Sequence, residues 1–90
     1  GNYALFNTTT GGYNTATGAD ALYNNSTGAR NTAIGYYALR QNSSGSYNTG
    51  IGFNSNSSST SATGQVTLGD ANVTSLRCND TSISLIHLTV

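Results

Sequence analysis

Side chains suited to catalysis or ligand binding are few in this 90-residue chain and lie far apart. His87 is the only histidine, Cys78 is the only cysteine, and the acidic residues are three aspartates. A nucleophilic triad or a metal centre needs several such groups converging on one point, but the sequence has no Gly-x-Ser-x-Gly turn. We expect His87 to pack on an apolar strand and Cys78 to be a small buried side chain. The sequence therefore predicts a protein that is not an enzyme, with no catalytic residue, metal ligand or cofactor.

The composition narrows the classes of partner. Three arginines balance three aspartates, with no lysine or glutamate, whereas a nucleic-acid binder needs many cations to neutralise phosphates. No apolar run reaches the length of about 18 residues that spans a membrane. We therefore expect neither nucleic-acid binding nor membrane insertion. Only 36% of the residues are hydrophobic, so we expect part of the apolar burial to come from neighbouring chains.

The strongest signal is an internal repeat with a step of 17 residues. Three units read GNYALFNTTTGGYNTAT, GADALYNNSTGARNTAI and GYYALRQNSSGSYNTGI, and a fourth, GFNSNSSSTSATGQVTL, is degenerate. Because a unit this short cannot bury its own apolar face, the units must stack on one another. The columns that define the repeat are Gly18, Gly35, Gly52 and Gly69; Leu5, Leu22 and Leu39; Ile34 and Ile51; and Asn14, Asn31 and Asn48.

The pattern within each unit favours strands over helices. From Asn31 onward, residues alternate in type with the period of a strand, and no window has the apolar spacing of a helix. Clusters such as NNSTG and QNSSGS read as turns. We predict an all-β, elongated repeat fold, β-solenoid-like or β-prism-like, in which each unit is a bent strand or short strand pair of about 8–10 residues. Residues 1–51 would hold three repeats, 52–68 the degenerate fourth, and 69–90 a C-terminal β segment.

Stacking in register predicts a role for each column. We expect the Leu column and the column that contains Ile34 and Ile51 to form two internal ladders, with Thr32 on the same inward side. The Gly column would mark close backbone approaches, and the Asn column would form side-chain amide ladders. Residues that vary between units would face solvent or a partner.

Two segments resemble a known family. The unit NTAIGYYALRQNSSG resembles the repeats of bacteriophage tail fibres and is similar to the head repeats of trimeric adhesins. The segment GQVTLGDANVTSLRCNDTSIS is similar to the stretch that precedes the C-terminal intramolecular chaperone of endosialidase-type tail fibres. The resemblance covers nearly the whole chain and implies an intertwined homotrimer in an extracellular or virion fibre. Where such fibres continue into the charged start of the chaperone, this sequence reads LIHLTV, so no self-cleavage residue is carried over.

As function we expect a structural segment of such a fibre, which supports attachment to a host surface. Its partners would be copies of itself and a host surface glycan or protein. Alternatives are the head domain of a bacterial trimeric adhesin, a secreted microbial filament subunit and an ice-binding β-solenoid. The ice-binding alternative is disfavoured by the expected inward position of Thr32. Candidate contact residues are Tyr13, Tyr36, Tyr37 and Tyr47. Packing between the chains of a trimer is the favoured alternative for them.

Overall fold

The computed structural model describes residues 2–77 and 79, and all regular structure within them is β. Four short strands recur at the 17-residue step: β1 (Thr15–Thr17), β2 (Thr32–Ile34), β3 (Thr49–Ile51) and β4 (Val66–Leu68). They form one parallel sheet in chain order, and each residue pairs with the one 17 positions later. The prediction of an all-β repeat fold is confirmed at this level. The strands themselves, at three residues each, are much shorter than expected.

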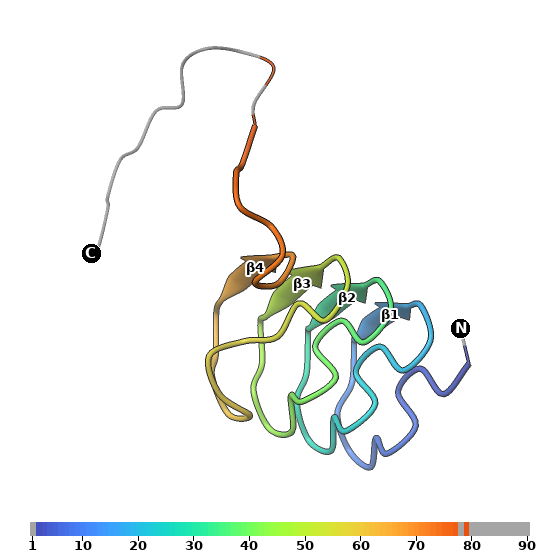
Figure 1. Cartoon of the computed structure of the whole chain (residues 1–90). Coiled ribbons are helices and arrows are strands. Elements are labelled where there is room, and N and C mark those ends of the chain that lie inside the picture. The colour runs from blue at the N-terminus through green and yellow to red at the C-terminus, as the bar shows by residue number, and fades with distance from the viewer. Residues whose placement is uncertain (1, 78, 80–90) are drawn as a thin grey trace.

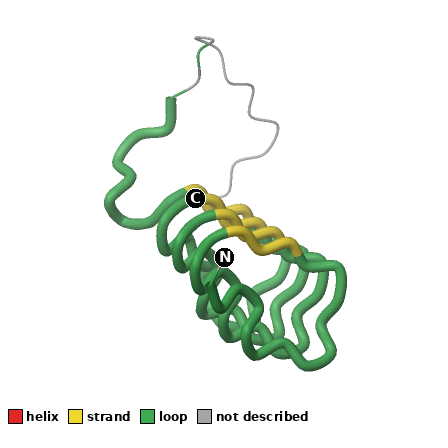
Figure 2. Tube along the Cα trace, turned by 90° about the vertical axis from the view of Figure 1, so that its right-hand side faces the viewer, coloured by secondary structure: helices red, strands yellow, loops and turns green. Residues whose placement is uncertain are grey.

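Each 17-residue unit makes one turn of a solenoid, and successive turns lie side by side (Figure 1). We number the turns coil 1 (2–17), coil 2 (18–34), coil 3 (35–51) and coil 4 (52–68). Parallel neighbours need a connection of about a dozen residues or more, and residues 18–31 between β1 and β2 meet this need. Figure 2 shows the strands stacked along one side of the solenoid, with loops and turns completing the rest of each coil.

A narrow core runs through the middle of the coils and is enclosed by one chain. Leu22 and Leu39 are fully buried there, together with Ala21, Ala33 and Ala38. Leu5 packs against this cluster from coil 1 and is half-buried. The Leu column therefore lies inside a single solenoid, and its burial needs no neighbouring chain.

The turns depend on left-handed backbone conformations at residues other than glycine. Positive φ angles recur in three columns, and the buried Leu22 and Leu39 have φ values of 53° and 49°. Such a conformation costs on the order of 1–3 kcal/mol at a non-glycine residue unless its surroundings impose it. Here burial of the Leu side chain fixes the turn. The other two columns are Tyr3, Asp20, Tyr37 and Asn54, and Tyr13, Arg30 and Tyr47.

The first glycine column lies at one of the places where consecutive coils approach closely. Gly35 has φ +131°, and a Cβ there would lie 2.8 Å from the backbone carbon and oxygen of Gly52. Gly18 meets Gly35 in the same way, at 2.6 Å. At the end of the column, the Gly69 amide donates to the Ile51 carbonyl at 2.8 Å. Only a residue without a side chain fits these coil-to-coil contacts.

After β4 the described chain contains no further strand. Residues 70–73 form a turn, in which the Val73 amide donates to the Asp70 carbonyl at 3.0 Å. Most of the C-terminal β segment expected for 69–90, including His87 and the run around it, lies outside the described residues, as does Cys78.

Candidate interaction surface and its internal supports

The outward side of the sheet carries two uncharged columns of side chains. Strand residues alternate in direction, so the fully buried Ala33 points inward, while Ile34 is 43% exposed. The first outward column is Thr15, Thr32, Thr49 and Val66, and the second is Thr17, Ile34, Ile51 and Leu68. We call these two columns the sheet face. It is a regular array of threonine and aliphatic side chains held in register by the backbone.

The sheet face corrects the predicted second ladder. Ile34 and Ile51 were expected inside the solenoid with Thr32 beside them, and that prediction is wrong, because Ile34 and Ile51 are each 43% exposed. The cause is the width of the core. A Cβ added at Gly50, the inward position of β3, would lie 2.7 Å from Cγ of Leu39. The inward position must therefore be small, and the larger branched residues on either side of it face outward.

A stack of three side chains lies just before the strands in coils 1–3. The guanidinium carbon of Arg30 lies 5.0 Å from the ring centroid of Tyr13 and 5.8 Å from that of Tyr47. Cation–π contacts of this kind are worth about 0.5–1 kcal/mol at exposed sites, and both tyrosines are exposed. The three residues are spaced by 17, so the sequence held this signal, but the prediction named only the two tyrosines.

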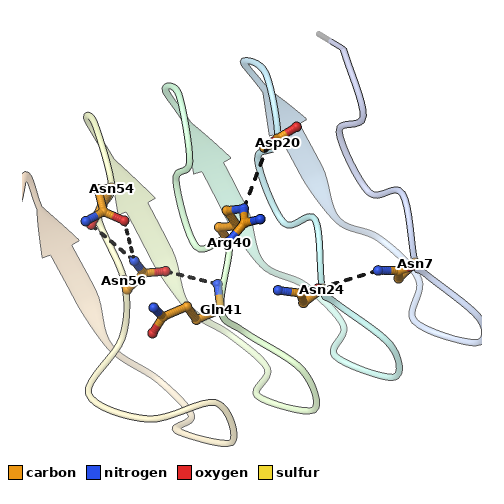
Figure 3. A network of polar contacts seen from close by, with 7 residues as sticks. All are labelled: Asn7, Asp20, Asn24, Arg40, Gln41, Asn54 and Asn56. Carbon is orange, nitrogen blue, oxygen red and sulfur yellow. Dashed lines mark hydrogen bonds and ion pairs between the residues drawn. The ribbon is translucent and has the colours of Figure 1, made fainter.

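A larger aromatic cluster follows the strands. Tyr36 stacks on Tyr37 with ring centroids 4.0 Å apart and on Phe53 at 5.8 Å. Arg40 lies 4.9 Å from the Tyr37 ring centroid, and its Nε is 3.8 Å from a carboxylate oxygen of Asp20 (Figure 3). Because the rings stack on one another, much of their flat surface is used within the chain. The cluster ties coils 2, 3 and 4 together along the outside.

The surroundings of one phenol in this cluster raise its pKa. The pKa of Tyr36 is raised above its ordinary value, first by the hydrogen bond between its hydroxyl and that of Tyr37 and then by partial loss of solvent. The Tyr37 and Asp20 charges act in the same direction, and Arg40 opposes them. Tyrosine is neutral at physiological pH at its ordinary pKa, and the raised pKa of Tyr36 keeps this phenol neutral further into the alkaline range.

Asn14, Asn31 and Asn48 form a ladder inside the solenoid. Oδ1 of Asn14 accepts from the Asn31 amide, Oδ1 of Asn31 accepts from the Asn48 amide, and both distances are 2.9 Å. Each Nδ2 donates in turn to a carbonyl of the following coil, such as Asn31 to Gly45 at 2.9 Å. Buried polar groups need such partners. The ladder fixes the spacing of coils that have little apolar area.

Asn25 and Asn42 form a second buried ladder, which the sequence analysis did not predict. Nδ2 of Asn42 donates to Oδ1 of Asn25 at 2.8 Å and to the Gly45 carbonyl at 3.0 Å. Both asparagines begin Asn-x-Ser/Thr sequons, yet both are buried, so neither is accessible to a glycosyltransferase in the folded chain. Their 17-residue separation was the available signal. On the outer surface of the solenoid, Nδ2 of Asn7 donates to Oδ1 of Asn24 at 3.5 Å (Figure 3).

The described region offers no enclosed site for chemistry. Residues 2–77 and 79 contain no detectable pocket and no group of three potential metal-ligating side chains. In the same part of the chain no helix is long and apolar enough to cross a membrane. The most regular surface of this region is the sheet face.

Comparison with known proteins gives no assignment by similarity. No protein-family model, curated protein or solved structure matches the chain.

Proposed function

We propose that the chain is a structural segment of a trimeric extracellular or virion fibre, in which copies of the solenoid associate through the sheet face. The observation that supports the proposal most directly is the column of exposed aliphatic residues, Ile34, Ile51 and Leu68. These side chains lie on the outside of a sheet whose inner side is already packed. A second copy is the occupant that fits this surface best, because the surface is uncharged, rigid and uniform along the solenoid.

The energetics favour contact with a like surface. Fully burying an exposed aliphatic side chain contributes about 1.5–3 kcal/mol. Ile34, Ile51 and Leu68 are 43%, 43% and 49% exposed in the single chain, so each would contribute roughly half of that in the interface. No ion has to be stripped of water there, because the sheet face holds no charged residue. The backbone of the strands is already fixed by pairing on both sides in β2 and β3. Little conformational freedom would therefore be lost on association.

The trimer that we propose is not intertwined, because each chain closes its own coils. Each chain completes its own core around Leu22 and Leu39, so the solenoids would pack side by side and need not exchange strands. The sheet faces would meet at the centre of the trimer, leaving the aromatic cluster and the Tyr13–Arg30–Tyr47 stack at its outer edges. Three copies of such a surface could contact a host glycan or protein with combined avidity.

The resemblance of NTAIGYYALRQNSSG to tail-fibre repeats supports this proposal from the sequence side. An adhesin head or a secreted filament would use the same face in the same way. The sequence that follows this chain in its gene distinguishes them: a tail fibre continues into a chaperone domain, and an adhesin into a coiled-coil stalk and a membrane anchor.

Ice binding is a second candidate, because Thr15, Thr32 and Thr49 line the sheet face in register. Hydroxyl and methyl groups repeated at the inter-strand distance of about 4.8 Å form the kind of regular surface that can order water. The two functions compete for one face, since a face covered in a trimer cannot bind ice. Thermal hysteresis measured on the purified chain separates them: we expect none, and clear hysteresis from a monomeric chain would favour ice binding.

Substitution on the sheet face tests the proposal. We expect Ile34→Asp with Ile51→Asp to convert the trimer into monomers in analytical ultracentrifugation while the circular dichroism spectrum stays unchanged. The matched control is Thr27→Asp with Ser44→Asp, which places the same charges on exposed turns of coils 2 and 3. A double Ile variant that still forms the same assembly as the control would refute association through the sheet face.

A further inference from the structure

The second glycine column shows why coils 1 to 3 each accept another coil. Gly11, Gly28 and Gly45 stand at the eleventh position of the 17-residue units that start at residues 1, 18 and 35, and a Cβ built on any of them would overlap the carbonyl oxygen of the residue 17 positions later. That oxygen belongs to the backbone and cannot swing away as a flexible side chain could. A coil with a side chain at this position therefore cannot take another coil on its C-terminal side without a shift of the backbone.

Coil 4 has Ala62 at this position. Its carbonyl accepts from Nδ2 of Asn48 at 2.7 Å, as the Gly45 carbonyl accepts from Asn31 and the Gly28 carbonyl from Asn14. Residue 62 therefore occupies the same place in the stack as the glycines before it. A Cβ built on each of those glycines meets the carbonyl of the next coil, so the methyl group of Ala62 would meet the carbonyl of a fifth coil stacked in the same way.

The Asn ladder also ends in coil 4. The backbone amide of Gln65 donates to Oδ1 of Asn48 at 3.0 Å. Gln65 therefore bonds to the preceding coil as the asparagines of the ladder do. Its own side chain turns back within coil 4: Oε1 accepts from the Ser58 amide at 2.8 Å, and Nε2 donates to Oγ of Ser58 at 2.7 Å. Both ends of its side-chain amide thus bond within coil 4, whereas the side-chain amides of Asn31 and Asn48 bond to the following coil.

The Leu column ends at the same coil. Asn56 stands where Leu22 and Leu39 stand in coils 2 and 3. Its Oδ1 accepts from the Gln41 amide of coil 3 at 3.1 Å, and its Nδ2 donates to Oδ1 of Asn54 at 2.9 Å (Figure 3). The column thus ends in a part-buried polar side chain that bonds to coil 3 and within coil 4.

From these contacts we infer that coil 4 is a stop coil: Ala62, Gln65 and Asn56 close the C-terminal end of the solenoid to any further coil of this repeat. A closing repeat with a polar end also keeps an open core from attracting other chains. The N-terminal end has the opposite character. Coil 1 presents there the Gly11 carbonyl and the Asn14 backbone amide, the groups that in coils 2 and 3 bond to the Asn side chain of the preceding coil. The partner that fits this surface is a coil of the same 17-residue register with glycine at its eleventh position.

Insertion of one extra coil tests the inference. A second copy of residues 35–51 placed between residues 51 and 52 adds one complete coil-to-coil contact, and we expect the Tm to rise by about 4 °C or more. The same 17 residues placed ahead of residue 1 should give a similar rise. Placed between residues 68 and 69, they should leave the Tm unchanged, and their amides should exchange with deuterium as fast as those of an unfolded peptide.

A matched variant replaces the three residues that close coil 4 with those of the earlier coils. In the chain with the insertion after residue 68, Ala62→Gly with Gln65→Asn and Asn56→Leu should restore the rise in Tm and protect the inserted amides. Ala62→Gly alone should give part of this effect and serves if the triple variant does not fold. If Ala62, Gln65 and Asn56 are kept and the Tm rises equally after insertion at residue 51 and at residue 68, the inference is overturned. Failure of both variants to protect the inserted coil would overturn the assignment to these residues. Because amide exchange is read coil by coil, neither result depends on association through the sheet face.

Discussion

The backbone amide of Asn48 donates to the side-chain oxygen of Asn31, 17 residues earlier, at 2.9 Å. Through its nitrogen, the same Asn31 side chain donates to the Gly45 carbonyl at 2.9 Å, and both asparagines are fully buried. One amide thus joins two segments of coil 3 to coil 2. In a chain with so little apolar area, such amides replace the wide hydrophobic core of an ordinary domain.

Replacing Asn31 with alanine should destabilise the solenoid strongly. The change leaves the Asn48 amide and the Gly45 carbonyl without their partners in the interior, and each unsatisfied buried group costs about 1–3 kcal/mol. We expect a loss of about 2–5 kcal/mol in the free energy of unfolding, measured by urea denaturation. Asn24→Ala is the control, because Asn24 is exposed and its loss should change stability by less than about 0.5 kcal/mol. Equal effects of the two substitutions would contradict a structural role for the ladder.

The Leu column and the sheet face should respond to mutation in different ways. Leu39→Ala removes a fully buried side chain from the core of one chain and should lower the free energy of unfolding by about 2–5 kcal/mol. Ile51→Ala, on the outward side, should instead weaken self-association and leave the fold of the single chain intact. Circular dichroism and sedimentation together separate the two effects. A Leu39→Ala chain that keeps its melting temperature but dissociates would place Leu39 in an interface, against the structure.

The close approach of coils at Gly35 predicts a severe effect of a single methyl group. Gly35→Ala brings a Cβ to 2.8 Å from the Gly52 backbone in a conformation that alanine rarely adopts, and we expect a loss of about 2–5 kcal/mol. Gly12→Ala is the matched control, since a Cβ there meets nothing within 4 Å. Its reduced freedom in the unfolded chain should leave stability unchanged or raise it by up to about 1 kcal/mol. Thermal melting of both variants is decisive, and similar melting temperatures would refute the contact.

The raised pKa of Tyr36 predicts a dependence of stability on alkaline pH. A folded-state pKa above the unfolded one means that the native state holds its proton more tightly, so the contribution is fully present below the unfolded pKa. It is lost as the pH rises through the folded pKa. Tyr37→Phe removes the hydrogen bond that is the largest cause and should bring the Tyr36 pKa down towards its ordinary value. NMR titration of the Tyr36 ring signals at alkaline pH measures this shift, and an unchanged Tyr36 titration in the variant would exclude the hydrogen bond as its cause.

Much of the architecture can be predicted from the sequence because the repeat length of 17 residues is constant. Any fold that stacks the units in register places Leu22 over Leu39 and Asn31 over Asn48, whatever the path of the chain between them. The strand content of the repeat and the absence of a helical pattern then suffice to predict the fold class. For the same reason, Asn25 and Asn42 could have been paired from their spacing alone.

The direction of Ile34 and Ile51 could not be derived in the same way. Alternation shows that Ile34 and Ala33 face opposite sides, but it does not say which side is the core. From hydrophobicity alone, isoleucine is expected on the inside. In the structure the core is too narrow for it, and alanine lies there instead. That choice depends on the reach of Leu39 across the coil, a three-dimensional fact. Left-handed turns at Leu22 and Leu39 were equally hidden, since leucine is a poor candidate for positive φ.

The mass of the assembled protein in solution tests the central claim most directly. We predict that native mass spectrometry and sedimentation equilibrium at neutral pH give three times the 9.2 kDa of one chain, and that the Ile34→Asp, Ile51→Asp variant gives a single folded chain. A mass of one chain at every concentration measured, with the β-type circular dichroism spectrum intact, would contradict the proposed fibre segment.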